Sequence, residues 1–327
     1  MSRLPPEWEP HERTIIAWPS RDERWDDVDE AGEEIAEIAN AIAQFEPVTV
    51  IADPGAVADA RPLLSGDVEL YESAIDDAWL RDSGPVVMPD RAIGFAFNGW
   101  GGRWSVEHDA TLAERIAAIA SVRLERSSLV LEGGAFAITA DHTLIAAESC
   151  LLNPNRNPTL TKADIERLLR DAFAVDEILW LGDGIEGDDT DGHIDDLTRF
   201  VGRDTVVTVV EPNRADPNHA VLDANLRKLG TLRVGGRPLT VVELPMPEPQ
   251  YLEDQRLPAS YANFYVANDA VLVPVFGCAQ DDAACAILRE CFPRRRVVAI
   301  DCRVLIAGLG ALHCLTQQVP SAPEPRQ

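Results

Sequence analysis

A repeating order of helix and strand patterns constrains the fold of this chain more than any other feature of its sequence. Five segments have the periodicity of amphipathic helices, and several begin with a capping side chain, such as Thr161 before Asp164. Strand patterns fill the gaps between the helices, which recur at intervals of roughly 50 to 80 residues. The predicted helices span residues 29–45, 109–121, 161–173, 216–228 and 281–291. The strand patterns that directly follow them are VTVIAD, VRLERS, EILWLG, TLRV and RVVAID.

This order predicts an α/β fold in which a ββαβ-like unit is used five times. Such units suit a closed radial arrangement, which leaves few sheet edges exposed. An ordinary doubly wound α/β sheet also alternates strands with helices and stays an open alternative on this pattern alone. The sequence has no GxGxxG after its first strand and no GxxxxGK[ST] segment, which weakens a nucleotide-binding version of that alternative.

The chain is predicted to form a single domain over residues 1–327. The proline-rich run 243–260 is the nearest candidate for a linker, but strand patterns on both sides favour a surface loop. The tail from about residue 321 to 327 is expected to be disordered.

The charge balance restricts the partners of the protein. A formal net charge of −26 argues against nucleic acid, whose binding needs a basic surface. The charge is compatible with a small cationic substrate, although a saline or GC-rich source would give the same balance, and Lys162 and Lys228 are the only lysines. The sequence leaves a homo-oligomer open.

The apolar runs and the cysteines allow a prediction of where the protein is located. No apolar run has the roughly 18 residues that a membrane span needs, and the N-terminus lacks a charged-then-apolar secretory leader, so we expect no membrane association. The six cysteines form neither a CxxC pair nor a zinc pattern with histidine, which is typical of reduced thiols in a cytoplasm.

Two isolated carboxylates occur at predicted strand ends. Asp82, in WLRDSGP, lies on a turn at a strand entrance, where it could simply cap that turn. Glu132, in LVLEGGAF, interrupts an apolar strand and is followed by two glycines that permit a bulge or a close backbone approach. A carboxylate buried there must be paired or have a shifted pKa, so a structural ion pair is the competing interpretation.

The stretch GDDTDGHIDDLTRF holds five aspartates and one histidine within nine residues. His193 and Asp195 are two positions apart, so on an extended strand they would face the same way and suit acid–base chemistry. A metal-binding loop and a solvated loop are the alternatives. The stretch lacks the order of acidic residues found in an EF-hand.

Cys314 follows the segment GLGALH near the end of the chain. A free cysteine is most often a small buried hydrophobic residue. If the flanking glycines take the tight turn, Leu309 needs no positive φ. A nucleophilic thiol needs a neighbour that lowers its pKa or accepts its proton, and His193 could do so. Several acids without a nearby arginine cluster favour a planar, positively charged substrate such as a guanidinium.

The chain resembles the agmatine deiminase branch of the guanidine-modifying enzymes, whose relatives include bacterial-type peptidyl-arginine deiminases. The matching motifs extend from Pro5 to Pro320 and are PPEWEPHERTIIAWPSR, WLRDSGP, FAFNGWGG, LEGGAF, TDGHIDDLTRFV, YANFYVAN and GLGALHCLTQQVP. The resemblance implies a five-bladed α/β-propeller (pentein) with ββαβ blades and a central site. It implies a C–N hydrolase of polyamine and arginine metabolism that needs no cofactor or metal.

The resemblance also implies roles for individual residues. Cys314 would be the nucleophile, and His193 would be the general acid and base. Asp82 and Asp195 would hold the guanidinium. Glu132 would hold His193 in place, and Trp79 would line the pocket.

For the distal end of the substrate the sequence offers Asp188 and Asp189 in the acidic stretch, and Trp18 and Trp25 near the N-terminus. These acids and aromatic rings suit the ammonium group of agmatine. Free or peptidyl arginine is the alternative substrate. A non-catalytic guanidine or polyamine binder and an amidinotransferase are the remaining hypotheses.

Overall fold

The computed structural model describes residues 3–19, 25 and 27–322, and four of its sheets share one topology. In each, the first two strands are antiparallel and the second and third are parallel. The four sheets are β4 (Val86–Val87), β5 (Arg91–Ala96) and β6 (Arg123–Val130); β7 (Phe136–Ile138), β8 (Thr143–Ala147) and β9 (Glu177–Leu181); β10 (Thr198–Phe200), β11 (Thr205–Val210) and β14 (Thr240–Pro245); and β17 (Tyr265–Val266), β18 (Ala270–Val275) and β19 (Arg296–Asp301).

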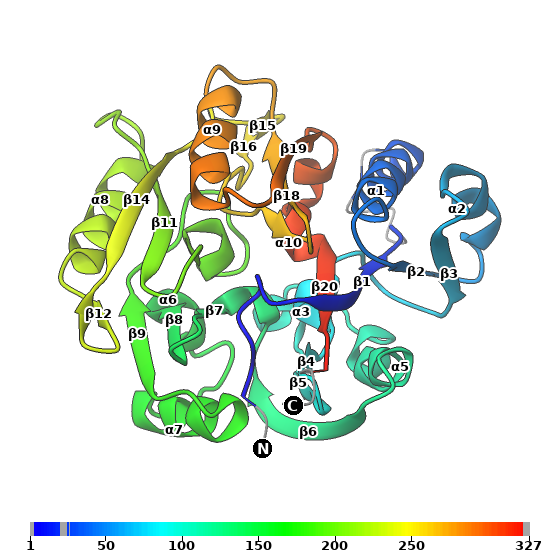
Figure 1. The fold of residues 1–327 in the computed structure, drawn as a ribbon, viewed down its shortest axis with the longest axis horizontal. Coiled ribbons are helices and arrows are strands. Elements are labelled where there is room, and N and C mark those ends of the chain that lie inside the picture. Colours follow the sequence, from blue (N-terminus) through cyan, green and yellow to red (C-terminus); the bar gives the residue numbers. More distant parts are fainter. Residues whose placement is uncertain (1–2, 20–24, 26, 323–327) are drawn as a thin grey trace.

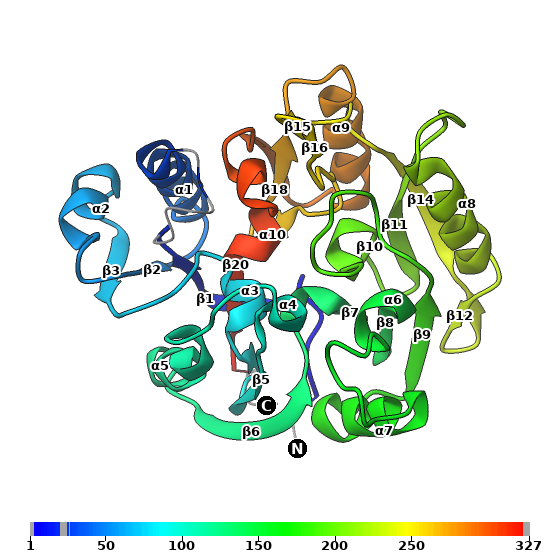
Figure 2. The same ribbon diagram turned by 180° about the vertical axis from the view of Figure 1, so that it is seen from behind.

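A further sheet joins the two ends of the chain. The C-terminal strand β20 (Thr316–Pro320) pairs antiparallel with β1 (His11–Ala17), which pairs parallel with β2 (Val48–Ala52), and β3 (Val68–Glu72) extends the sheet. Figures 1 and 2 show β20 running through the middle of the molecule beside β1. The N-terminal and C-terminal segments therefore complete one unit together, with the antiparallel-then-parallel order of the other four.

One long helix connects the parallel strands of each unit, because a parallel connection must cross over the sheet. These helices are α1 (Val28–Ile42), α5 (Leu112–Ile119), α7 (Lys162–Phe173), α8 (Asn218–Leu229) and α9 (Asp281–Cys291). All five helices predicted from periodicity are confirmed, and Thr161 and Asp164 form the capping box that starts α7. The extra helix α2 (Val57–Leu63) contains Pro62, and the prediction missed it.

The central strands of the sheets contribute many of the buried side chains of the core. The strands β2 and β8 are buried along their whole length, which is typical of parallel strands covered on both faces. Within the described residues, no helix combines the length and the apolar character needed to cross a bilayer.

Two strand predictions were wrong. Part of the predicted strand TLRV forms β12 (Arg233–Val234) in a hairpin with β13 (Arg237–Pro238), because Gly235 and Gly236 supply the two positive φ values of a tight turn. The strand that pairs with β11 after α8 is β14 instead. The predicted strand around Glu132 is also interrupted, since a short 3₁₀ turn (Gly133–Ala135) separates β6 from β7.

The predicted surface loop 243–260 contains the end of β14 and a hairpin of β15 (Tyr251–Leu252) and β16 (Gln255–Arg256). Of the tail predicted to be disordered, residues 323–327 lie outside the described residues. Ser321 lies within them, and its backbone N–H donates to the Pro10 carbonyl at 2.8 Å.

Candidate active site

Asp82 lies in the one-turn helix α3 (Leu80–Ser83), near the middle of the molecule (Figure 2). Its Oδ1 accepts a hydrogen bond of 2.9 Å from the backbone N–H of Gly134, and its Oδ2 accepts one of 2.9 Å from Trp100 Nε1. Two other segments of the chain therefore hold Asp82, and among the described residues its side chain makes no hydrogen bond that caps the SGP turn in which it stands. Burial raises the pKa of Asp82, and the charge of Asp195 adds to that rise, although His193 opposes it.

Gly134 marks the point where the polar groups converge. A β-carbon on Gly134 would lie 2.6 Å from His193 Nδ1, 2.8 Å from Asp195 Oδ2 and 3.0 Å from Asp82 Oδ1. Three functional groups from different parts of the sequence therefore face one small space that only glycine leaves open. The predicted close backbone approach at this glycine pair is confirmed.

His193 and Asp195 do not share a strand face, contrary to the prediction. Both belong to the 3₁₀ turn Ile194–Asp196 and its N-cap, so the turn, rather than strand alternation, sets their directions. The fully buried imidazole of His193 still lies between carboxylates, with Nδ1 3.6 Å from Asp82 Oδ2 and 3.9 Å from Asp195 Oδ1. Burial alone would lower the pKa of His193, but the charge of Asp82 and the contact with Cys150 raise it well above its usual value.

Residues 187–193, here called the acidic loop, are held by their own carboxylates. Asp188 accepts backbone hydrogen bonds from Thr190 at 2.7 Å, Gly192 at 2.9 Å and His193 at 3.3 Å. Asp191, at φ +68°, accepts from Arg103, Asn155 and Arg156. Carboxylates bound by so many N–H donors argue against the calcium-loop alternative. Asp188 organises the backbone that leads into His193.

Glu132 forms a buried ion pair, which is the competing interpretation named above. Its Oε1 accepts a 2.6 Å hydrogen bond from Nε of the fully buried Arg156, whose other nitrogens donate to Asp191 and to the Thr190 carbonyl. A carboxylate oxygen of Glu132 also lies within 4.8 Å of a ring nitrogen of His193. Glu132 is thus beside His193 as expected, but its hydrogen bond goes to Arg156.

Cys314 lies in the one-turn helix α10 (Leu312–Leu315), and its side chain is nearly buried. Asn263 Nδ2 donates to its Sγ at 3.1 Å, and Asp195 Oδ2 lies 3.6 Å from the same sulfur. Burial raises the pKa of the Cys314 thiol well above its usual value, and the charges of Asp195, Asp196 and Asp82 raise it further. A cation that entered among these carboxylates would oppose this rise and favour the thiolate.

In residues 308–314, here called the nucleophile loop, the expectation that Leu309 needs no positive φ is wrong. Leu309 itself adopts φ +70° and ψ 24°, whereas Gly308 and Gly310 are required for space. A β-carbon on Gly308 would lie 2.5 Å from the ring of Trp25, and one on Gly310 would lie 2.6 Å from the ring of Trp79. The two indoles pack on each other with ring centroids 5.7 Å apart, so both predicted tryptophans lie against this loop.

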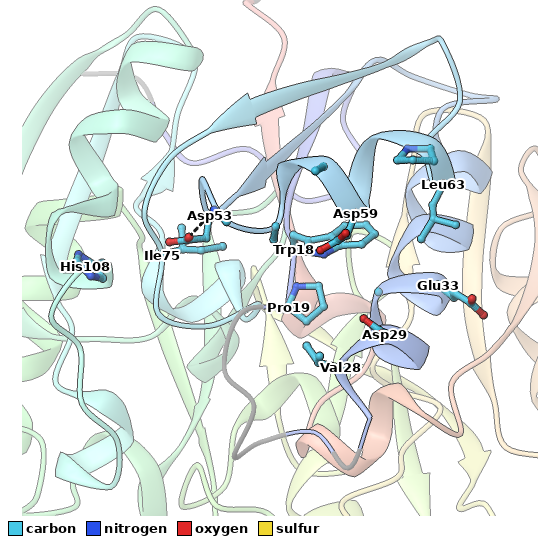
Figure 3. A pocket seen from close by; sticks show the side chains of 15 residues that line it. Trp18, Pro19, Val28, Asp29, Glu33, Asp53, Asp59, Leu63, Ile75 and His108 are labelled. Carbon is cyan, nitrogen blue, oxygen red and sulfur yellow. Dashed lines mark hydrogen bonds between the residues drawn. The ribbon is translucent and has the colours of Figure 1, made fainter.

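Asp189 and Trp18 are the other two residues considered for the distal end of the substrate. Asp189 is half-buried and accepts a 3.3 Å hydrogen bond from Trp104 Nε1. Trp18 packs over Gly32 and lines a separate surface cavity of about 760 Å³ between α1 and α2, shown in Figure 3. Trp18 is therefore not part of the cluster around Cys314.

Sequence analysis missed a buried chain of polar groups behind Asp195. His313 Nδ1 lies 2.7 Å from Asp195 Oδ2, and His313 Nε2 lies 2.9 Å from Glu7 Oε1. Arg199 pairs with the other oxygen of Glu7. Glu7 stands in the first matching motif and His313 precedes Cys314, but only the fold brings together residues 306 positions apart.

The chain was compared with known proteins. The profile of a family described as Porphyromonas-type peptidyl-arginine deiminase matches residues 3–320. The agmatine deiminase of Pseudomonas aeruginosa (strain LESB58) is 38% identical over 98% of this chain and 95% of its own length. Among solved structures, an agmatine deiminase of Enterococcus faecalis has a TM-score of 0.94 and 31% identity, covering 98% of this chain and 96% of its own.

A further similar structure is a serine variant of the C. jejuni agmatine deiminase with substrate bound. It has a TM-score of 0.91 and 28% identity and covers 98% of this chain and 97% of its own. Profile, sequence and mixed α/β structure agree over nearly the whole chain. The chain belongs to the Porphyromonas-type peptidyl-arginine deiminase family.

Proposed function

We propose that this protein is an agmatine deiminase, which hydrolyses agmatine to N-carbamoylputrescine and ammonia. One observation carries the proposal: the thiol of Cys314, the imidazole of His193 and the carboxylates of Asp82 and Asp195 face a single buried space beside Gly134. The likeness to agmatine deiminases over nearly the full length supports the same reaction.

The two aspartates are proposed to bind the guanidinium group. A carboxylate accepts paired, charged hydrogen bonds from a guanidinium, which fixes the plane of the substrate as well as its position. Asp195 Oδ2 lies 3.6 Å from Cys314 Sγ, so a substrate nitrogen held by Asp195 would bring its carbon toward the sulfur. This orientation removes much of the entropic barrier to attack.

Substrate binding is proposed to activate the nucleophile. The bound cation offsets the negative charges that keep Cys314 protonated, so the thiol releases its proton to solvent and the thiolate adds to the guanidinium carbon. His193, protonated between Asp82 and Asp195, donates its proton to the departing nitrogen, and ammonia leaves. A thiouronium intermediate remains on sulfur. The neutral His193 then takes a proton from water, and the resulting hydroxide releases the urea product and frees Cys314.

Other residues are proposed to support this reaction. Glu132 positions the acidic loop through Arg156 and stands beside His193. Trp79 and Trp25 pack against the nucleophile loop and line the approach to Cys314. Asp189 is the proposed partner for the distal ammonium group of agmatine.

Agmatine is favoured over free arginine by the charges near the acidic loop. The α-carboxylate of arginine would need a cationic partner. Arg103 and Arg156, whose guanidinium groups donate to this loop, are already bound to Asp191. Peptidyl arginine is the second candidate, because the family profile carries that name.

We also propose that the five sheets form the blades of a five-bladed α/β-propeller within one domain. The support is the same antiparallel-then-parallel order in every unit and the pairing of β20 with β1, by which the last and first segments complete one sheet.

Incubation with agmatine, arginine and a blocked arginine peptide, followed by measurement of ammonia and ureido product, tests the function. We expect turnover of agmatine above the other two, and no turnover by a folded Cys314→Ala variant. A folded wild-type protein that turns over none of the three would contradict the proposal, whereas preference for the peptide would favour the second candidate. Amine acceptors added during turnover would reveal an amidinotransferase.

A further inference from the structure

Three buried side chains of different chemistry meet at the proposed general acid, which is one of them. Cys150 lies in the one-turn helix α6 (Glu148–Leu151), directly after β8, and its side chain is fully buried. One ligand atom each of Cys150, Glu132 and His193 lies within 4.8 Å of the other two. The proposed reaction uses His193 but has no role for the thiol of Cys150.

Atoms in this group lack hydrogen-bond partners. Among the described residues, Glu132 Oε2 and both ring nitrogens of His193 have none in hydrogen-bonding geometry, although these side chains are fully buried. Unpaired buried polar atoms are costly, and in a native protein each one needs an explanation. A bound cation would provide electron-pair acceptors for the carboxylate oxygen and for an unprotonated ring nitrogen.

The surrounding charges suit a cation. The carboxylates of Asp82 and Asp195 lie 3.6 and 3.9 Å from His193 Nδ1, and Asp188 and Asp196 also act on His193. The one opposing charge described in contact with the group is Arg156, which is bound to Glu132 Oε1 and Asp191. The negative charge around His193 therefore exceeds the positive charge.

We propose that Cys150, His193 and Glu132 form an inhibitory binding site for a thiophilic divalent cation, with Zn²⁺ as the best-matched ion. One thiolate, one imidazole and one carboxylate are ligands that Zn²⁺ accepts, whereas Ca²⁺ and Mg²⁺ prefer oxygen alone. Zinc–ligand bonds of about 2.0 to 2.3 Å require the three atoms to approach within roughly 3.3 to 3.8 Å of one another. Small side-chain rotations would have to supply that contraction. Binding releases two protons to solvent, the thiol proton of Cys150 and one ring proton of the protonated His193.

The consequence for catalysis rests on the proposed function. An imidazole nitrogen that binds the ion can neither donate a proton to the leaving group nor take one from water. The added charge would also disfavour a guanidinium between Asp82 and Asp195. We therefore expect reversible inhibition by Zn²⁺ that a chelator removes and that agmatine opposes by competition.

Binding is tested without turnover, so that the site and the proposed function can fail separately. The Cys314→Ala protein, freed of metal by a chelator, is titrated with Cd²⁺ while the ultraviolet thiolate-to-Cd²⁺ charge-transfer band is recorded. We expect about one tightly bound ion per chain with a thiolate band. In the same background Cys150→Ser should abolish the band, and Cys302→Ser, which alters another fully buried thiol, should leave it unchanged.

A second substitution guards against misfolding of the Cys150 variant. His193→Gln in the Cys314→Ala background should weaken Cd²⁺ binding at least about tenfold, with the circular dichroism and melting temperature of the parent retained. A thiolate band that the wild-type protein shows and the Cys314→Ala protein lacks would mean that the cation binds Cys314 instead of Cys150. Binding that survives both Cys150→Ser and His193→Gln would overturn the proposal, whether or not the wild-type protein turns over agmatine.

Discussion

The acidic loop and the nucleophile loop each present one proposed reacting group, but different forces hold them. Around the acidic loop, Asp188 and Asp191 bind backbone N–H groups and arginines, and the loop delivers His193. Around the nucleophile loop, indole rings fill the space above two glycines, and the loop delivers Cys314. A network of charges can fix a proton-transferring group and also shift its pKa, whereas packing fixes a thiol without adding charge to it.

The pKa values of carboxylates near the two loops are shifted in opposite directions. Burial raises the pKa of Asp191, but hydrogen bonds from Arg103, Asn155 and Arg156 outweigh it and lower that pKa far below its usual value. Within the described part of the chain, Glu34 accepts hydrogen bonds from backbone N–H groups alone, those of Val304 and Leu305 just before the nucleophile loop. Burial consequently raises the pKa of Glu34 to about 7.

The largest loss of stability is expected when Arg156, the buried cation bound to Glu132 and Asp191, is replaced. Arg156→Met leaves Glu132 and Asp191 without their buried partner, and breaking such a pair costs about 3–5 kcal/mol. Urea unfolding should show this loss in the free energy of unfolding. Arg103→Met is the matched control, because Arg103 binds the same Asp191 from a partly exposed position and should cost about 1 kcal/mol or less. Equal losses in the two variants would contradict the proposed role of burial.

The pH dependence of stability should distinguish Glu34 from the arginine-paired acids. Its folded pKa of about 7 exceeds the unfolded value of about 4.5, so the folded state holds the proton more tightly. The contribution of Glu34 to stability is therefore fully present below pH 4.5 and falls as the pH rises to 7, by about 2–3 kcal/mol. Relative to wild type, Glu34→Gln should thus be more stable at pH 8 than at pH 5.

Unfolding of wild type, Glu34→Gln and Glu33→Gln at several pH values separates this contribution from the rest of the protein. Glu33 is the exposed neighbour of Glu34 on α1 and serves as the control. A pH-independent difference between Glu34→Gln and wild type would contradict the raised pKa.

The sequence predicts local structure better than it predicts contacts. The five long helices follow from periodicity, and Cys314, His193, Asp82 and Asp195 follow from motifs whose convergence depends on the fold. The predicted strand TLRV ended before Gly235, and the hairpin was missed because its second strand, Arg237–Pro238, is a charged residue and a proline without a strand pattern.

Side-chain partners far apart in the chain were the hardest to predict. Glu132 could be a catalytic acid or an ion-pair member, and the choice depends on Arg156, which no spacing rule selects. Leu309 adopts the positive φ, whereas the two flanking glycines are needed because the rings of Trp25 and Trp79 leave no room for a β-carbon there. Local propensity would have chosen the opposite assignment.

The contact between His313 and Asp195 joins the nucleophile loop to the turn that follows the acidic loop. Substitution of His313 tests whether the two loops act together. His313→Leu removes the donor to Asp195 and the contact with Glu7, and a lost hydrogen bond to a charged group costs about 1.5–3 kcal/mol. We expect kcat/KM for agmatine to fall about 10- to 100-fold. His313→Asn keeps a donor near the position of Nδ1 and should retain most activity. Equal activity of Leu and Asn variants would mean that the donor to Asp195 does not matter.

The smallest expected effect comes from adding one methyl group to the nucleophile loop. In Gly310→Ala the new β-carbon would lie 2.6 to 2.9 Å from three ring atoms of Trp79, so the ring or the loop must move. Overpacking of this kind costs about 1–3 kcal/mol, and displacement of Cys314 should lower kcat more than it raises KM. Gly66→Ala is the control, because nothing lies within 4 Å of its added carbon. Because the added carbon meets an uncharged ring, the loss in Gly310→Ala should be insensitive to salt and to pH between 5 and 8. A salt-dependent loss would instead mean that the added carbon also disturbs the polar contacts of His313 with Asp195 and Glu7.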